Sequence, residues 1–156
     1  MHVIMSTKGI PVIEISMNAF CHATEDLNKV KTAMMNLIPE SIRSGVIFSE
    51  DILEGYYGNV IVNVKLHFSD KIAVKEIIEY FCKNISDNDK RLLYRTLDYR
   101  LDESCVLHIR FDKGAAYNGV LRLNDGSEVI KVTLKFNVKK RLVRDACIEI
   151  GLISGE

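Results

Sequence analysis

The sequence lacks any apolar run long enough for a membrane, since no window approaches the roughly 18 apolar residues that a spanning helix needs. Its start, MHVIMSTKGIPVIEI, also lacks the charged beginning and unbroken apolar stretch of a signal peptide. Repeats, low-complexity tracts and linkers are missing as well. We therefore expect a cytoplasmic protein without a membrane partner, folded as a single domain over residues 1–156.

Cysteine pairs with the CxxC spacing of structural zinc sites do not occur. The four cysteines are widely spaced, and each falls in an apolar phase of a predicted strand or helix: Cys21, Cys82, Cys105 and Cys147. We expect free thiols that are buried in the core. The sequence predicts neither a bound metal nor a cofactor.

Catalytic signatures are missing too, since no nucleophile elbow, P-loop, Rossmann fingerprint or HExxH motif is found. Cys21 and His22 do not form a nucleophile–base pair, because neighbouring strand residues point to opposite faces. Acid–base cleavage of a phosphodiester stays open as an alternative, if at least two of His22, His67 and His108 share one pocket. We expect no catalytic residues and no enzyme activity.

The sequence has no net excess of either charge, with 21 basic and 21 acidic residues, but these residues are distributed unevenly. Between Cys105 and Arg144 the chain has nine basic and three acidic residues, a local balance of +6. The remaining 12 basic and 18 acidic residues give −6. The basic C-terminal region hints at a polyanionic partner.

Alternation of apolar and polar residues predicts strands over residues 11–22, 60–68, 105–111 and 128–139, with a less regular one over 45–53. Gly55 and Gly58 mark a tight turn, so the strands on either side of it should form a hairpin. Clean alternation leaves one sheet face polar, as an antiparallel sheet allows. An α+β fold follows: a two-layer sandwich with a largely antiparallel sheet and helices on one face.

Helix start signals occur at Thr24, at Ser69 or Asp70, and at Ser86, where Asp89 would complete a capping box. In the second helix we expect Ile72 to belong to the buried face. In the third we expect the basic residues, Arg100 included, to meet solvent or a partner. Residues 140–152 fit a short amphipathic helix or a docking tail.

Extending the strand phases gives one polar set: Ser16, Asn18, His22, Asn63, Lys65, His67, His108, Arg110, Arg122, Lys131, Lys135 and Lys139. Three of its lysines recur every four residues, so their backbones would stand roughly 13 Å apart along one strand and could reach successive phosphates. Tyr57 and Tyr117 could stack on unpaired bases at its edge. The alternative is an ordinary solvated sheet face.

The segment RFDKGAAYNGVLRL, residues 110–123, connects two alternating runs and is the stretch most suggestive of a partner. Its small residues would let a backbone approach closely, while Lys113, Tyr117 and the flanking Arg110 and Arg122 offer donors and a ring. We expect a loop that holds an anionic partner.

Three segments in register, FCHATED (20–26), LEGYYGNVI (53–61) and RFDKGAAYNGVLRL (110–123), resemble an archaeal family described as RNA-binding or exosome-related, with a fold like ribosomal protein L5. The resemblance spans nearly the whole chain and implies a domain that binds RNA without a known reaction. It places six residues at matching motif positions: His22, Asn59, Arg110, Lys113, Tyr117 and Arg122. Where the family more often has histidine, this chain has Tyr56, which retains a stacking ring but no imidazole.

Three functional hypotheses result. The first is a non-enzymatic protein that binds RNA, structured rather than single-stranded, with phosphate contacts from Arg110, Lys113, Arg122, Lys131 and Lys135 and base stacking on Tyr57 or Tyr117. The second is a protein-interaction module, a homodimer or an adaptor for RNA-processing proteins, that uses residues 45–53 and the C-terminal helix. The third is the histidine-dependent phosphodiesterase.

Overall fold

The computed structural model describes residues 9–55 and 57–155; Tyr56 and most of the N-terminal stretch discussed above lie outside the described residues. The strands are β1 Val12–Cys21, β2 Ser49–Glu54, β3 Val60–Phe68, β4 Val106–Asp112 and β5 Val129–Phe136. The helices are α1 Leu27–Met35, α2 Glu40–Arg43, α3 Lys71–Asn84, α4 Asp87–Arg100, α5 Lys113–Tyr117 and α6 Val143–Ile150, with a 3-10 turn at Lys140–Leu142.

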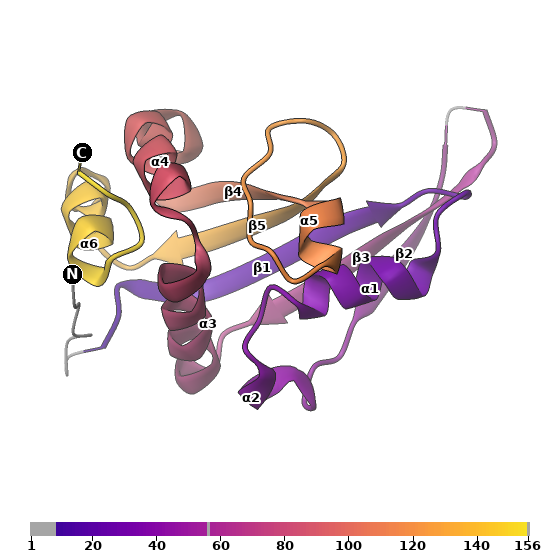
Figure 1. Ribbon diagram of the computed structural model, residues 1–156, viewed down its shortest axis with the longest axis horizontal. Coiled ribbons are helices and arrows are strands. Elements are labelled where there is room, and N and C mark those ends of the chain that lie inside the picture. Colours follow the sequence, from indigo (N-terminus) through magenta and orange to yellow (C-terminus); the bar gives the residue numbers. More distant parts are fainter. Residues whose placement is uncertain (1–8, 56, 156) are drawn as a thin grey trace.

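The strands form one antiparallel sheet in the order β2-β3-β1-β5-β4, and α1, α3, α4 and α5 lie on one side of it (Figure 1). Alternate residues of β1, such as Ile15 and Met17, are buried under these helices, whereas Ser16 and Asn18 on the other face are partly exposed. The α+β class is confirmed. We call the uncovered side the open face.

The hairpin of β2 and β3 extends past the helices on the right of Figure 1. The geometry of its turn favours glycine at both Gly55 and Gly58. Gly58 has a φ of +82°, which other residues adopt only with strain. At Gly55, a Cβ would lie 2.5 Å from the Asn59 side-chain oxygen. The predicted turn and hairpin are confirmed.

Two predicted helix starts are confirmed and one is wrong. Asp70 caps α3 by accepting from the Ala73 N–H, and Ser86 caps α4 by accepting from the Asp89 N–H. Helix α1 begins after Asp26 rather than Thr24, because the Asp26 carboxylate accepts from the Asn28 N–H.

Only half of the predicted capping box at the start of α4 forms. The Asp89 carboxylate does not return to Ser86 but accepts from the Leu123 N–H at 3.0 Å. It thereby ties the loop after α5 to α4, a long-range contact that the spacing of the two residues does not reveal.

Two expectations about side-chain exposure are wrong. Ile72 is 69% exposed on the first turn of α3. Arg100 is buried instead of solvated, because its guanidinium donates to Asp125 at 3.2 Å and to the Thr96 hydroxyl at 2.7 Å. A charged side chain tolerates burial when it is paired in this way.

Residues 113–117, expected to be part of an open loop, form the short helix α5. Asp112 caps it by accepting from the Ala115 N–H, and Gly119, with a φ of +81°, follows its end. Ala115 and Ala116 are buried, and Asn36, directly after α1, donates to the Ala116 carbonyl at 2.9 Å. The small residues therefore serve close packing of α5 against α1.

All four cysteines are free; Cys21 and Cys147 are buried, and Cys82 and Cys105 half-buried. Burial raises the pKa of Cys82 to about 11 and that of Cys147 to about 12. Because only the thiolate reacts, we expect alkylation of these two thiols at pH 8 to be at least about a hundredfold slower than that of an exposed cysteine. Mass spectrometry after iodoacetamide labelling measures this, with guanidinium-unfolded protein as the control. Rapid native-state labelling would contradict it.

No helix in the described part of the chain combines the length and apolarity needed to cross a membrane. Within the same residues, no group of three or more His, Cys, Asp or Glu side chains is arranged to hold a metal ion.

Candidate nucleic-acid interface

The strand register places much of the predicted polar set on the open face. Adjacent strands pair Lys65 of β3 with Asn18 of β1, Asn18 with Lys131 of β5, and Lys131 with Arg110 of β4. Partners in register share a sheet face. These four residues form a row across the sheet, called here the basic row. The members of the set that lie within the strands share this face, a point that the sequence alone left open.

The basic row runs across the strands, whereas the sequence suggested a line of lysines along one strand. Strand β5 ends at Phe136, so Lys139 lies beyond it. Lys131 and Arg110 stand about 5 Å apart and Lys65 about 10 Å from Lys131, counted in strand spacings. Lys135 lies about 13 Å from Lys131 along β5, opposite Glu14.

Acidic side chains of the protein neutralise only part of the positive charge of the basic row. Lys65 forms an ion pair with Asp51, while Lys131 lies over the Phe20 ring, with its ammonium 5.6 Å from the ring centroid. Arg110 donates to the Gly126 carbonyl at 2.7 Å. The Arg110 Nε is buried and has no acceptor among the described residues. A buried donor without an acceptor is costly to the fold.

A shallow depression of about 460 Å³ lies on the open face beside the basic row. Its polar lining is Ser16, Asn18, Ser49, Asn63, Lys65, His67 and Thr133. Inside it the Asn18 amide donates to the Asn63 carbonyl oxygen at 3.2 Å, and Ser16 Oγ lies 2.9 Å from His67 Nδ1.

Phe20 is the residue of this face that sequence reasoning missed. It occupies the same phase of β1 as Ser16 and Asn18, opposite Asn63 of β3, and its ring is half-buried under Lys131. An apolar residue at an outward-facing position was the signal that could have revealed it.

The three histidines do not converge. His67 and His108 lie in register with Ser16 and Thr133, in one row but three strand spacings apart, about 14 Å. His22 lies beyond the end of β1, with Nε2 3.9 Å from Glu128. His108 contacts Asp102 at 3.0 Å, which leads the causes that lower the pKa of that carboxyl group. This placement does not provide the shared pocket that a phosphodiesterase needs.

Lys113 lies away from the open face, in a buried ion-pair cluster. Its ammonium donates to the Phe20 carbonyl at 2.7 Å and to both Glu25 oxygens at 3.1 and 3.2 Å, with Glu128 3.7 Å away. Only 8% of the residue is exposed. Contact with a phosphate would require Lys113 to leave these acceptors, so its geometry is that of a structural cross-link between β1 and α5.

Tyr117 lines a cleft of about 630 Å³ between α1 and α5, together with Lys113. The cleft has four carboxylates and two lysines: Glu25, Asp26, Asp112, Glu128, Lys29 and Lys113. The Lys29 ammonium lies 5.9 Å from the Tyr117 ring centroid. A net acidic lining disfavours a polyanion here. Base stacking on Tyr117 stays a prediction.

The other predicted residues lie at the periphery. Tyr57 and Asn59 belong to the exposed tip of the hairpin, and Arg122 is exposed on the loop after α5. The structure thus divides the predicted site among the open face, the α1–α5 cleft and the hairpin tip.

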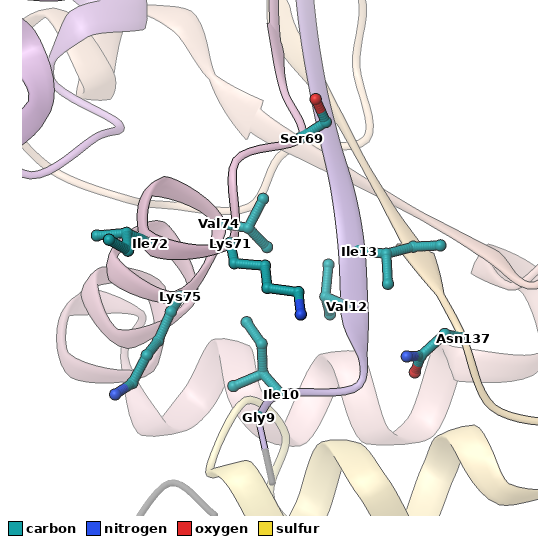
Figure 2. Close-up of a pocket in the computed structure, with 10 residues that line it drawn as sticks. All are labelled: Gly9, Ile10, Val12, Ile13, Ser69, Lys71, Ile72, Val74, Lys75 and Asn137. Atoms are coloured by element: carbon teal, nitrogen blue, oxygen red, sulfur yellow. The ribbon is translucent and has the colours of Figure 1, made fainter. Parts of the chain in front are cut away.

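A third hollow, a pocket of about 360 Å³, lies between the start of α3 and the start of β1 and contains none of the predicted site residues (Figure 2). Its walls are largely apolar, with Ile10, Val12 and Val74 among them. Lys71 reaches across it towards β1, while Lys75 points away (Figure 2).

A family model described as RNA binding matches residues 14–136. RNA-binding protein PAB1135 of Pyrococcus abyssi is 34% identical over 139 residues, which cover 86% of this chain and 90% of the relative. The crystal structure of AF2318 from Archaeoglobus fulgidus has a TM-score of 0.77 at 27% identity, covering 89% of this chain and 99% of its own. Mth689 of Methanothermobacter thermautotrophicus, a DUF54 protein, gives 0.75 at 26% identity, covering 90% and 98%. The chain belongs to the family that this model describes as RNA binding.

Proposed function

We propose that the protein binds RNA through the open face of its sheet and catalyses no reaction. The observation that carries the proposal is the basic row, in which Asn18 stands between Lys65 and Lys131, and Arg110 stands next to Lys131. Cations on a sheet face neutralise phosphates, and the family's description agrees with this use.

Other predicted residues take supporting roles in this proposal. Lys135 and Arg122 extend the basic surface beyond the row, and Tyr57 and Asn59 contact RNA only where it reaches the hairpin tip. Lys113 acts through the fold, since its ammonium is occupied by Glu25 and the Phe20 carbonyl. The exosome link and the L5-like fold come from the resemblance alone and stay predictions.

A binding titration tests the proposal, with a labelled hairpin RNA and an unstructured RNA of equal length at 50 and 200 mM salt. We expect tight binding of the hairpin RNA at low salt, and a loss of about tenfold or more in affinity in Lys131→Glu, because reversal replaces an attraction by a repulsion. The matched control is Lys75→Glu, an exposed lysine on α3 in the helix layer. Equal affinity of the two variants, or binding insensitive to salt, would contradict the proposal.

An alternative function, protein interaction, is favoured by one observation: all six residues of the edge strand β2 are exposed. The other edge, β4, is covered by bridges from Leu101 and Leu123. A second copy could add its own β2 to this edge as an antiparallel strand. Two registers would then pair five residues of each β2 and keep the open faces of both sheets on the same side. They place Asp51 opposite Asp51, or Glu50 opposite Glu54, and like charges opposite each other are unfavourable.

The partner of β2 in this alternative is therefore a basic extended segment of another protein, and we expect the isolated chain to be monomeric. Light scattering measures its mass. A dimer that dissociates on Ile52→Lys would instead place a second copy against this edge, because Ile52 is 76% exposed and lies at its centre.

A further inference from the structure

We propose that the open face binds one unpaired nucleobase, preferably adenine, at the edge of the depression formed by Asn18 and Asn63. The base would stack on Phe20, which lies just outside the depression, and form hydrogen bonds with Asn18 and Asn63. The inference rests on the proposed function and gives its site a ligand: a base in a loop or bulge of a structured RNA. Such unpaired bases are where proteins read RNA sequence.

The hydrogen-bonding capacity of the amide pair carries the first step. The bond between Asn18 and Asn63 uses one donor and one acceptor. It leaves the Asn63 side-chain amide group and the Asn18 side-chain carbonyl oxygen without a partner among the described residues. The same complement remains if both amides are turned over. A phosphate offers acceptors only, whereas a base edge offers a donor next to an acceptor, and asparagine matches that pattern on adenine.

The position of the ring carries the second step. Phe20 lies two residues from Asn18 on the same face of β1 and directly opposite Asn63. Residues two apart on a strand are about 7 Å apart, close enough for one base to meet both the ring and the amides. An aromatic ring on an open sheet face is how other sheet proteins stack unpaired bases. Lys131 now lies over this ring as a cation–π contact.

The charges beside the amides carry the third step. Asn18 stands between Lys65 and Lys131 in the basic row. A nucleotide whose base lies at this edge of the depression would place its flanking phosphates near these two ammonium groups, and Lys131 would leave the Phe20 ring for a phosphate. The amides and the ring would bind the base of one nucleotide while the two lysines bind its phosphates. A sheet face that only contacts solvent would not need these groups next to one another.

Four hairpin RNAs that differ only in one loop base, A, C, G or U in an oligouridine loop, test the inference. We expect the wild type to bind the A loop about tenfold more tightly than the others, as expected for a good amide–base pair. The double variant Asn18→Ala/Asn63→Ala should lose this preference and keep its salt dependence. Phe20→Leu, which preserves an apolar side chain, should weaken all four RNAs by about fivefold or more because the flat ring is lost. The matched control, Asn28→Ala on the exposed face of α1, should change neither.

The outcomes distinguish this inference from the proposed function. A double variant that unfolds at the wild-type temperature and retains the wild-type preference would overturn base reading while RNA binding stood. Equal binding of all four loops by the wild type would overturn it as well. If no loop binds in a salt-dependent way, the proposed function fails and the inference fails with it. A 2-aminopurine at the loop position gives an independent readout, since its fluorescence should be quenched by the wild type and much less by Phe20→Leu.

Discussion

Replacing Lys113 with methionine should lower the free energy of unfolding by about 3 kcal/mol, the low end of the range for breaking a buried ion pair. Methionine fills similar space, but it removes the cation that pairs with the half-buried Glu25 carboxylate and the donor that the Phe20 carbonyl accepts from. The low end applies because the Glu25 side chain is 26% exposed and that of Glu128 61%. Urea denaturation followed by circular dichroism measures the change.

Lys29→Met is the matched control, because Lys29 lines the same cleft but is exposed. We expect it to change the free energy of unfolding by less than about 0.5 kcal/mol, as is usual for surface substitutions. If Lys113→Met were as stable as this control, the cluster would contribute nothing to the fold. Lys113 would then be available for the phosphate contact expected from the sequence.

The loss of stability in Lys113→Met should depend on pH, because Glu25 of the same cluster titrates. Burial raises the pKa of the Glu25 carboxyl, but the His22 N–H and the Lys113 ammonium outweigh it and hold that pKa below its usual range. A lowered pKa in the folded state contributes stability above the unfolded value of about 4.5, and this stability is lost as the pH falls through the folded value. The difference between wild type and Lys113→Met should therefore shrink below about pH 4. A difference that stayed constant down to pH 3 would contradict an ionic role for Glu25.

Period-two alternation was sufficient to predict the strands of the sheet and, within each strand, the residues of its polar phase. Asn18, Lys65 and Lys131 have the same phase on three strands, and phase alone determines the face. The strand order was out of reach, because β1 lies between β3 and β5, which follow much later in the chain. Without that order, the three cations could not be recognised as one row.

The side chains whose surroundings the sequence did not reveal have a common feature, since most of them are charges whose partners are distant in sequence. Lys113 was expected to hold an anion from outside; in the structure it pairs with Glu25, 88 residues earlier, and its contact with a phosphate stays a prediction. Arg100 was expected at the surface and pairs with Asp125. Phe20 is the converse case, an apolar residue left on the polar face. A charged residue near glycines and alanines suggests a ligand and a buried ion pair equally well, and the structure alone distinguishes them.

Removing the cations of the basic row one at a time should flatten the salt dependence of RNA binding stepwise. For single-stranded RNA, each neutralised phosphate contributes about −0.7 to the slope of log affinity against log salt. Three contacts predict a loss of about 18-fold between 50 and 200 mM salt, two about sevenfold and one about 2.6-fold.

The series is Lys131→Gln, then Lys65→Gln added, then Arg110→Gln, with Arg141→Gln on the exposed turn before α6 as the control. Lys65 should show the smallest step, because Asp51 already neutralises part of its charge and is left unpaired by the substitution. A slope that fell with Arg141→Gln and not with Lys131→Gln would move the phosphate contacts from the open face to the C-terminal basic segment. Equal loss of affinity at both salt concentrations would mean that the row contributes shape and hydrogen bonds rather than charge, because only displaced counterions make affinity depend on salt.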